Sequence, residues 1–263
     1  MRLWNIGPVF QERVWGATKL QPWFPNSSKK MGEVWFQEPD SPILIKFLFT
    51  TENLSVQVHP DDGYAREHHD SPGKTEMWHV LGAEPGAKVA AGFREPVTRA
   101  QLKEAALSGE IMNLLEWFDA SAGDTFFIPA GTVHAIGAGL TICEIQQKSD
   151  VTYRIFDYGR GRELHLDHAL HVSKLDRCQP RANMPVACPY FAANRLTTEG
   201  YSLQLVTAPY QTLVMLGGEG KLGGHDVKPG QVWRHANTFL PIPTTAGLDI
   251  LHVCRPHLED DSE

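Results

Sequence analysis

Short apolar segments separated by glycine, proline and aspartate dominate the first 160 residues of the chain. Apolar and polar residues alternate within several of these segments, which is typical of half-buried β-strands. The turn-forming residues between them favour a sandwich or small barrel over a parallel α/β sheet. The expected strands lie at 43–49, 54–58, 77–81, 88–92, 125–128, 140–146 and 151–156. The pattern therefore predicts an all-β protein.

A weaker version of the same pattern follows from about residue 189. The expected strands of this later part lie at 202–206, 212–216, 231–233 and 248–253. With 263 residues, of which 42% are hydrophobic, the chain is long enough for a second small barrel with a core of its own. Residues 259–263 are mostly acidic, and we expect them to form a disordered tail.

Short helical segments are expected to interrupt the strands. Thr98 and Gln101 form a candidate capping box ahead of apolar residues at helical spacing, in an insert at about 98–118. Gly109 is expected to divide this insert into two short helices. A further short helix is expected at 166–172, and its histidines are interpreted as a solvated or partly packed face rather than a metal site. These histidines are His165, His168 and His171.

Composition and charge exclude several classes of protein. The four cysteines show no C-x-x-C spacing, so neither a zinc ribbon nor a disulfide framework is expected, and a reducing compartment fits best. The N-terminus has no signal-peptide core and no segment is apolar enough to cross a bilayer, so we expect a cytoplasmic protein without a membrane partner. With 24 basic and 31 acidic residues, the chain is not expected to bind nucleic acid.

One histidine is presented by a rare turn. Residues 123–138 read GDTFFIPAGTVHAIGA, which predicts a strand followed by a tight Pro-Ala-Gly turn. The turn places His134 at the start of the next segment. A histidine in such a position is a candidate ligand or catalytic group, provided that other polar side chains meet it.

A polar strand face supplies candidate partners for His134. Residues 54–59 alternate, so a strand here sends its apolar set to one side and its polar set to the other. The apolar set is Leu54, Val56 and Val58, and the polar set is Ser55, Gln57 and His59. Gln57 and His59 then stand about 6–7 Å apart along the strand, which suits two ligands of one metal ion.

A carboxylate at the start of the next strand completes a candidate metal site. Glu76 begins an apolar run, and with Gln57, His59 and His134 it offers two imidazoles, one carboxylate and one amide oxygen. This mixture suits zinc, or less well iron, manganese or nickel. A single histidine or glutamine on a strand is more often an ordinary core or surface residue. The coincidence of three such patterns favours the metal site.

Three further charged residues interrupt apolar strands. Glu144 and Arg154 lie on consecutive expected strands and could meet, either at a functional site or as an ordinary ion pair. Lys46 stands alone within residues 43–49, and its ordinary interpretation is a side chain that reaches solvent from a sheet edge.

Taken together, these residues resemble the type I phosphomannose isomerase (mannose-6-phosphate isomerase) family of the cupin superfamily, and its short bacterial branch most of all. The similarity covers about residues 10–175 and is fainter beyond. It is carried by LSVQVHPDD at 54–62, GKTE at 73–76, PAGTVHA at 129–135 and QKSDVTYRIFD at 147–157, with WG at 15–16 and GEVW at 32–35.

The resemblance implies two cupin jelly-roll barrels with short helical inserts: a metal-binding catalytic domain over 1–175 and a degenerate cupin-like domain over 176–258. The implied ligands of one zinc ion are Gln57, His59, Glu76 and His134. Arg154 is implied to be an essential catalytic residue, and Glu144 the proton carrier. The residues implied to lie near the substrate or its phosphate are Lys46, Ser55 and Lys74, with Lys74 a second candidate catalytic group.

The implied reaction interconverts mannose 6-phosphate and fructose 6-phosphate through a cis-enediolate. The chain is expected to act on this small sugar phosphate as a monomer or weak homodimer. Two alternatives stay open: a sugar-binding or regulatory cupin without turnover, and a cupin oxygenase that uses iron at the same site. Only seven residues separate Trp35 from Ile43, where many relatives have a longer connection, so one wall of the pocket could be missing.

Overall fold

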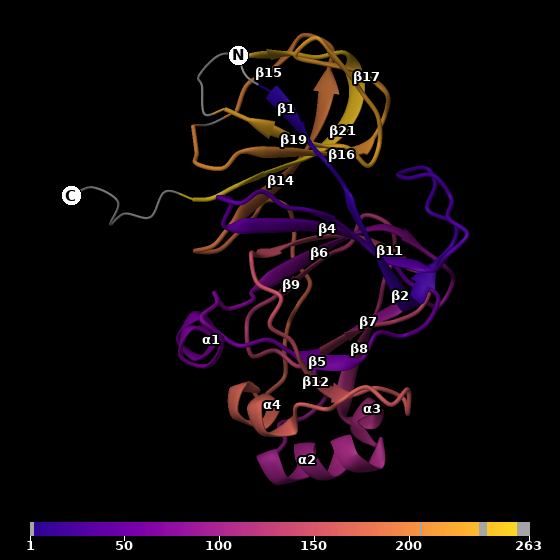
Figure 1. Cartoon of the computed structure of the whole chain (residues 1–263), viewed down its shortest axis with the longest axis vertical. Helices are drawn as coiled ribbons and strands as arrows, with labels where there is room; N and C mark the ends of the chain where they lie inside the picture. Colours follow the sequence, from indigo (N-terminus) through magenta and orange to yellow (C-terminus); the bar gives the residue numbers. More distant parts are fainter. Residues whose placement is uncertain (1–2, 206, 237–240, 257–263) are drawn as a thin grey trace, which may run out of the picture.

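Antiparallel β-sheets stacked along the long axis form most of the structure, a computed structural model that describes residues 3–205, 207–236 and 241–256 (Figure 1). The all-β prediction is confirmed. Among these described residues, no helix is long and apolar enough to cross a membrane. The expected acidic tail at 259–263 lies outside the described residues.

Two facing sheets form the first barrel. The β4 sheet contains, in spatial order, β2 (Val9–Ala17), β3 (Met31–Phe36), β4 (Ile43–Phe49), β11 (Leu140–Gln147), β6 (Glu76–Ala83) and β9 (Thr125–Ile128). The β5 sheet contains β12 (Tyr153–Phe156), β5 (Val56–Val58), β10 (His134–Ile136), β7 (Lys88–Phe93) and β8 (Leu115–Asp119). Side chains from both sheets, including Trp78 and Ile136, share one buried apolar cluster between them.

Alternation along β4 and β11 divides their side chains between two layers. Ile45 and Phe47 face away from the barrel and pack in a second core, whereas Lys46 between them turns into the barrel. In β11, Cys143 and Ile145 join the same outer core, and Glu144 turns inward beside Lys46. The period of two along a strand is therefore what delivers charged groups to the barrel interior.

The third sheet forms the second barrel-like unit at one end of Figure 1, where its strands are drawn in orange and yellow except for the indigo β1. This β16 sheet contains β1 (Leu3–Ile6), β19 (Val232–His235), β16 (Thr212–Gly217), β21 (Ala246–Cys254), β14 (Ala192–Glu199) and β13 (Val186–Ala187). Two small pairs accompany it: β15 (Ser202–Leu203) with β20 (Ile242–Pro243), and β17 (Gly220–Leu222) with β18 (His225–Val227). The first strand of the chain thus belongs to the later unit, because β1 pairs with β19 across the proposed division at residue 175.

In the part of the chain that the structure describes, four helices cover the outer face of the β5 sheet or flank it: α1 (Asp62–His69), α2 (Arg99–Ser108), α3 (Ile111–Leu114) and α4 (Leu166–Val172). The capping box of Thr98 and Gln101 and the helix break at Gly109 are confirmed, the latter by a φ of 85°. Helix α4 matches its predicted bounds, whereas α1 was not predicted. Residues 115–119, expected in the helical insert, form β8 instead, because they pair with the free edge of β7.

The strand at 54–59 is shorter than predicted. Only 56–58 form β5, and Val56 and Val58 pack against the helices as expected of an apolar face. Leu54 precedes the strand and packs in the cluster between the two sheets, so its predicted place with Val56 and Val58 is wrong. The polar set still lies toward the barrel interior, where Ser55 and Gln57 line a cavity.

Candidate metal centre and pocket

The four candidate ligands meet at one end of the first barrel. Gln57 lies on β5 and pairs with His134 at the start of β10, so neighbouring strands place these two side chains together. His59 follows β5, and Glu76 begins β6 in the facing sheet. The turn before His134 requires Gly131, which has a φ of +85° and lies so close to Val172 that a Cβ would approach its carbonyl oxygen to 3.0 Å.

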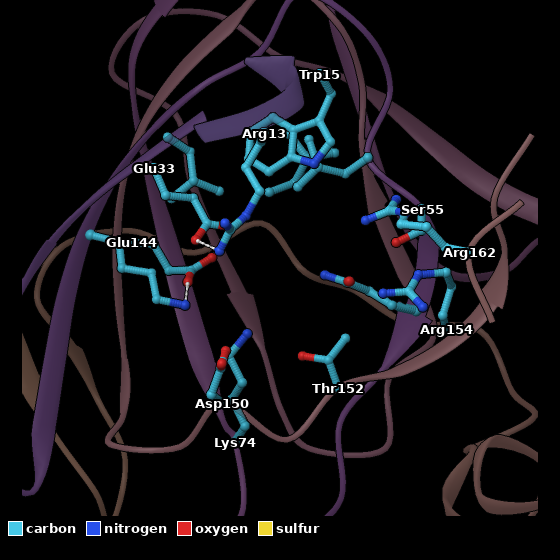
Figure 2. A pocket seen from close by; sticks show the side chains of 15 residues that line it. Arg13, Trp15, Glu33, Ser55, Lys74, Glu144, Asp150, Thr152, Arg154 and Arg162 are labelled. Carbon is cyan, nitrogen blue, oxygen red and sulfur yellow. Dashed lines mark hydrogen bonds and ion pairs between the residues drawn. The ribbon is translucent and has the colours of Figure 1, made fainter. Parts of the chain in front are cut away.

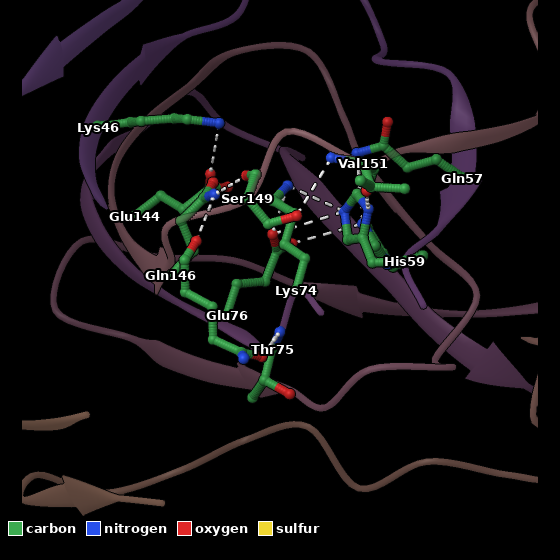
Figure 3. A network of polar contacts seen from close by, with 12 residues as sticks. Lys46, Gln57, His59, Lys74, Thr75, Glu76, Glu144, Gln146, Ser149 and Val151 are labelled. Carbon is green, nitrogen blue, oxygen red and sulfur yellow. Dashed lines mark hydrogen bonds and ion pairs between the residues drawn. The ribbon is translucent and has the colours of Figure 1, made fainter. Parts of the chain in front are cut away.

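The imidazoles and the carboxylate face one another at short distances (Figure 3). Nε2 of His59 is 3.6 Å from Oε2 of Glu76, and Nε2 of His134 is 3.4 Å from Oε1 of the same carboxylate. One donor atom from each of the three residues lies within 4.8 Å of the others, and all three side chains are buried. This spacing suits three ligands around a single divalent ion.

The tautomers of both histidines fit a metal. Nδ1 of His59 donates to the carbonyl oxygen of Val151 at 3.0 Å, and Nδ1 of His134 donates to that of Thr132 at 2.8 Å. Each Nε2 therefore keeps its lone pair toward Glu76, as a metal ligand must. Burial, the largest cause, lowers the pKa of His134 to about 4 and that of His59 well below its usual value, so both rings are neutral.

Two more polar groups touch this set. The side-chain amide of Gln57 is 3.3 Å from Nε2 of His134, and a 180° turn of the amide exchanges its nitrogen for an oxygen able to bind a metal. Nζ of Lys74 is 2.8 Å from Glu76 and 3.0 Å from Nε2 of His59. The carboxylate of Glu76 and the Nε2 lone pair of His59 thus already face a positive charge, the ammonium of Lys74. The residues present therefore fit a bound divalent metal.

A cavity of about 410 Å³ opens beside this set (Figure 2). The predicted site residues that line it are Lys46, Ser55, Gln57, Lys74, Glu144 and Arg154. The structure thus brings every predicted site residue either to this cavity or to the buried ligand set beneath it.

Other residues of the cavity were not predicted as site residues. They include Arg13, Trp15, Glu33, Asp150, Thr152 and Arg162. Glu33 could have been noticed as a charge that interrupts an alternating strand, and it pairs with Arg13 at 3.0 Å. Arg162 gives no such signal, because it reaches the cavity from a loop. The short connection after Trp35 suggested that one wall of the pocket could be missing. Arg13 and Trp15 of β2 line the cavity and form part of its wall.

Glu144 is the second buried carboxylate of the site. Its Oε1 is 3.5 Å from Nζ of Lys46, its register partner on β4, and its Oε2 accepts from the indole N–H of Trp78 at 3.1 Å. The same indole N–H is also 3.1 Å from Glu76, so Trp78 links the two carboxylates. Burial and then the charge of Glu76 raise the pKa of Glu144.

The ordinary interpretations of Lys46 as a solvent-reaching side chain and of Glu144 and Arg154 as an ion pair do not hold, although all three residues line the cavity. Lys46 does not reach solvent, since it is only 4% exposed and packs against the ring of Trp35. Glu144 pairs with Lys46 rather than with Arg154, because β11 lies beside β4 whereas β12 belongs to the facing sheet. Burial alone would lower the pKa of Lys74, but the carboxylates of Glu76 and Glu144 raise it above its usual value.

The fold and the site together define a cupin-type barrel with a His-Glu-His group that could hold a metal ion. No protein-family model matches the chain. A mannose-6-phosphate isomerase of Streptococcus mutans is 36% identical over 200 residues, which are 69% of this chain and 62% of the relative. Mannose-6-phosphate isomerase ManA of Bacillus subtilis is 30% identical over 270 residues, covering 82% of this chain and 85% of the relative. The chain belongs to the mannose-6-phosphate isomerase family.

Solved structures agree with this assignment at the level of the fold. The crystal structure of a mannose 6-phosphate isomerase from Bacillus subtilis superposes with a TM-score of 0.85 at 24% identity, covering 97% of this chain and 99% of that one. A zinc-bound mannose 6-phosphate isomerase superposes with a TM-score of 0.78 at 15% identity, covering 97% and 100%. The chain spans about three fifths of the length of the Streptococcus mutans relative.

Proposed function

We propose that the chain is a metal-dependent aldose-ketose isomerase that interconverts mannose 6-phosphate and fructose 6-phosphate. The observation that carries the proposal is the pair of buried carboxylates joined by Trp78: Glu76 sits in the ligand set, and Glu144 lies outside it on the cavity wall. One carboxylate is thereby assigned to metal binding and the other is free for proton transfer. The names of the relatives supply the substrate.

The proposed metal is zinc, held by Gln57, His59, Glu76 and His134. When bound, it would polarise the substrate carbonyl and stabilise negative charge that develops on oxygen. Two neutral imidazoles and one carboxylate are a ligand set that zinc commonly takes, and the neutral amide adds a weaker fourth donor.

The protein's own residues would move the protons. Isomerisation takes a proton from C2 and returns one to C1, while a second proton passes from O2 to O1. Glu144 is assigned the carbon-bound proton, because it is a buried carboxylate on the cavity wall outside the ligand set, where a positioned general base can reach the substrate. Lys74 is assigned to the oxygen-bound proton, and Arg154 to the negative charge of the enediolate.

Lys46 and Ser55 remain the proposed contacts to the substrate and its phosphate. A non-catalytic sugar-binding protein would not need Glu144 and Arg154, and both line the cavity. We further propose a monomer or weak homodimer. We also propose a cytoplasmic location, which four cysteines without disulfides support. The proposed domains are 1–175 and 176–258, with β1 as the strand that crosses between them.

Metal analysis and an activity assay on one preparation test the proposal. We expect about one zinc ion per chain and formation of fructose 6-phosphate from mannose 6-phosphate, followed in a coupled assay. His134→Ala should lose both metal and activity, whereas the matched variant His225→Ala, at an exposed position on β18, should keep both. A wild-type chain with neither tightly bound metal nor isomerase activity would contradict the proposal.

A further inference from the structure

Arg154 lies on an edge strand whose outer side is closed by a histidine. β12 is the last strand of the β5 sheet, so alternate backbone groups point away from any neighbouring strand. The N–H of Arg154 donates to Nδ1 of His165 at 3.0 Å, and its carbonyl oxygen accepts from the backbone N–H of His165 at 2.8 Å. One residue thus satisfies both outward backbone groups of Arg154, as a neighbouring strand would.

The side chain of Arg154 is held by the same loop. Its Nη1 donates to the carbonyl oxygen of Glu163 at 2.6 Å, and the side chain lines the cavity. Nε is buried and has no hydrogen-bond partner among the described residues. An unpaired buried donor is costly, so the contacts that hold this guanidinium at the cavity wall must offset that cost.

The loop that holds Arg154 is itself closed around a buried carboxylate. Asp157 accepts from Arg160 at 2.8 Å and from Nε of Arg162 at 2.8 Å, and the backbone N–H of Arg160 returns to its carbonyl oxygen at 3.0 Å. These bonds fix the path of the chain between β12 and α4. His165 and Glu163 therefore approach Arg154 from a firm support.

The contact requires a neutral imidazole. Burial, followed by the charge of Arg154, lowers the pKa of His165, so that Nδ1 keeps its lone pair as an acceptor. The other titratable groups facing the ring are Tyr153 on β12, Glu163 in the loop and His168 on α4, with His69 of α1 behind Tyr153. The side chain is half-buried and outside the metal ligand set.

We propose that His165 is a positioning residue for the isomerisation: its neutral imidazole holds Arg154 at the cavity wall and acts on the reaction only through that guanidinium. The proposal rests on the proposed function, in which Arg154 meets the enediolate. His165 lies outside the cavity wall, so the proposal adds a residue that does not touch the substrate. The sequence indicated this histidine only as part of a helix face.

Two variants separate the hydrogen bond from the bulk of the ring. His165→Ala removes the acceptor and should lower kcat about tenfold, the value of one lost hydrogen bond, with a smaller change in KM. His165→Asn places an oxygen near the position of Nδ1 and should restore kcat to within about threefold of wild type. His171→Ala, an exposed position on the same helix, is the matched control and should leave kcat unchanged.

A double-mutant cycle then asks whether His165 acts through Arg154. In an Arg154→Lys background, His165→Ala should cost less than about threefold, because the guanidinium that it positions is gone. A cost that stays near tenfold in this background would overturn the proposal, as would failure of the asparagine to restore kcat. A wild-type level of kcat in His165→Ala would overturn it as well.

A measurement without turnover keeps this inference separate from the proposed function. The ¹⁵N relaxation of the Arg154 Nε–Hε group, assigned by its loss in Arg154→Lys, reports how firmly the guanidinium is held. We expect an ordered signal in wild type and His165→Asn, and a mobile one in His165→Ala. Equal order in all three would refute the positioning role even in an active enzyme. If wild type fails to isomerise the sugar phosphate, the proposed function fails, and this signal still decides whether His165 holds Arg154.

Discussion

Replacement of Glu144 by glutamine removes a charge and a proton acceptor while keeping the shape of the side chain. Glu144 is 3% exposed, stands outside the ligand set and faces the cavity, so the change should leave metal binding intact. A positioned general base contributes about 10²–10⁴ in rate. At about 1.4 kcal/mol per tenfold, this corresponds to about 3–5 kcal/mol of transition-state stabilisation.

The same substitution also perturbs the fold. Nζ of Lys46 lies 3.5 Å from Glu144, and removing one partner of a buried ion pair costs about 3–5 kcal/mol. The glutamine oxygen can still accept from Lys46, and the ring of Trp35 lies 4.5 Å from the ammonium, so both reduce the loss. We therefore expect a decrease of about 2 kcal/mol in the free energy of unfolding.

Two measurements separate these effects. A coupled assay for fructose 6-phosphate gives turnover, and loss of deuterium from mannose 6-phosphate labelled at C2 reports the first proton transfer directly. Metal content and the urea midpoint show whether the variant is loaded and folded. A folded, metal-bound Glu144→Gln with near-wild-type turnover and label loss would show that another group removes the proton.

Three further predictions test the structure at the site and away from it. Gly131→Ala should weaken zinc binding, measured by competition with a chelator, because a Cβ there meets the carbonyl of Val172, whereas Gly123→Ala has open space and should leave zinc binding unchanged. Thr98→Ala should cost about 1 kcal/mol in urea unfolding through loss of the helix cap, with kcat unaltered; a larger loss of kcat would tie α2 to the site. His252 has its pKa lowered from 6.5 to about 4 by burial, so the unfolded chain takes up its proton first and stability falls as the pH drops from 6.5 toward 4. His252→Leu should remove about 2 kcal/mol of the loss in unfolding free energy between pH 7.5 and 5.0, and an unchanged pH dependence would contradict this assignment.

Local alternation was enough to predict the polar groups that enter the barrel. The spacing of Gln57 and His59, the turn before His134 and the isolated charges at Lys46 and Glu144 are all properties of single strands. All five side chains lie at the cavity or in the buried ligand set beside it. In each case the alternation of side chains along a strand can be seen within a few residues, and it decides to which side of the sheet a side chain points.

Pairing between distant strands could not be predicted in the same way. Glu144 meets Lys46 because β11 inserts between β4 and β6, a neighbour relation that sequence order does not reveal. Helix α1 escaped notice because Ala65 is its one buried residue, which leaves no apolar period to detect. Arg162 reaches the cavity through a loop folded around Asp157, and that path depends on contacts formed only in the folded chain.

The pairing of β1 with β19 has a consequence for how the protein is made. Leu3 is translated well before its partner His235, because the two residues lie far apart in the sequence. The core between the two barrels has the same property, because Ile6 and Phe24 pack with Val232 and Leu251. Until those later strands have been made, the apolar face of the first barrel stays uncovered, and an uncovered apolar face on a folding intermediate favours aggregation.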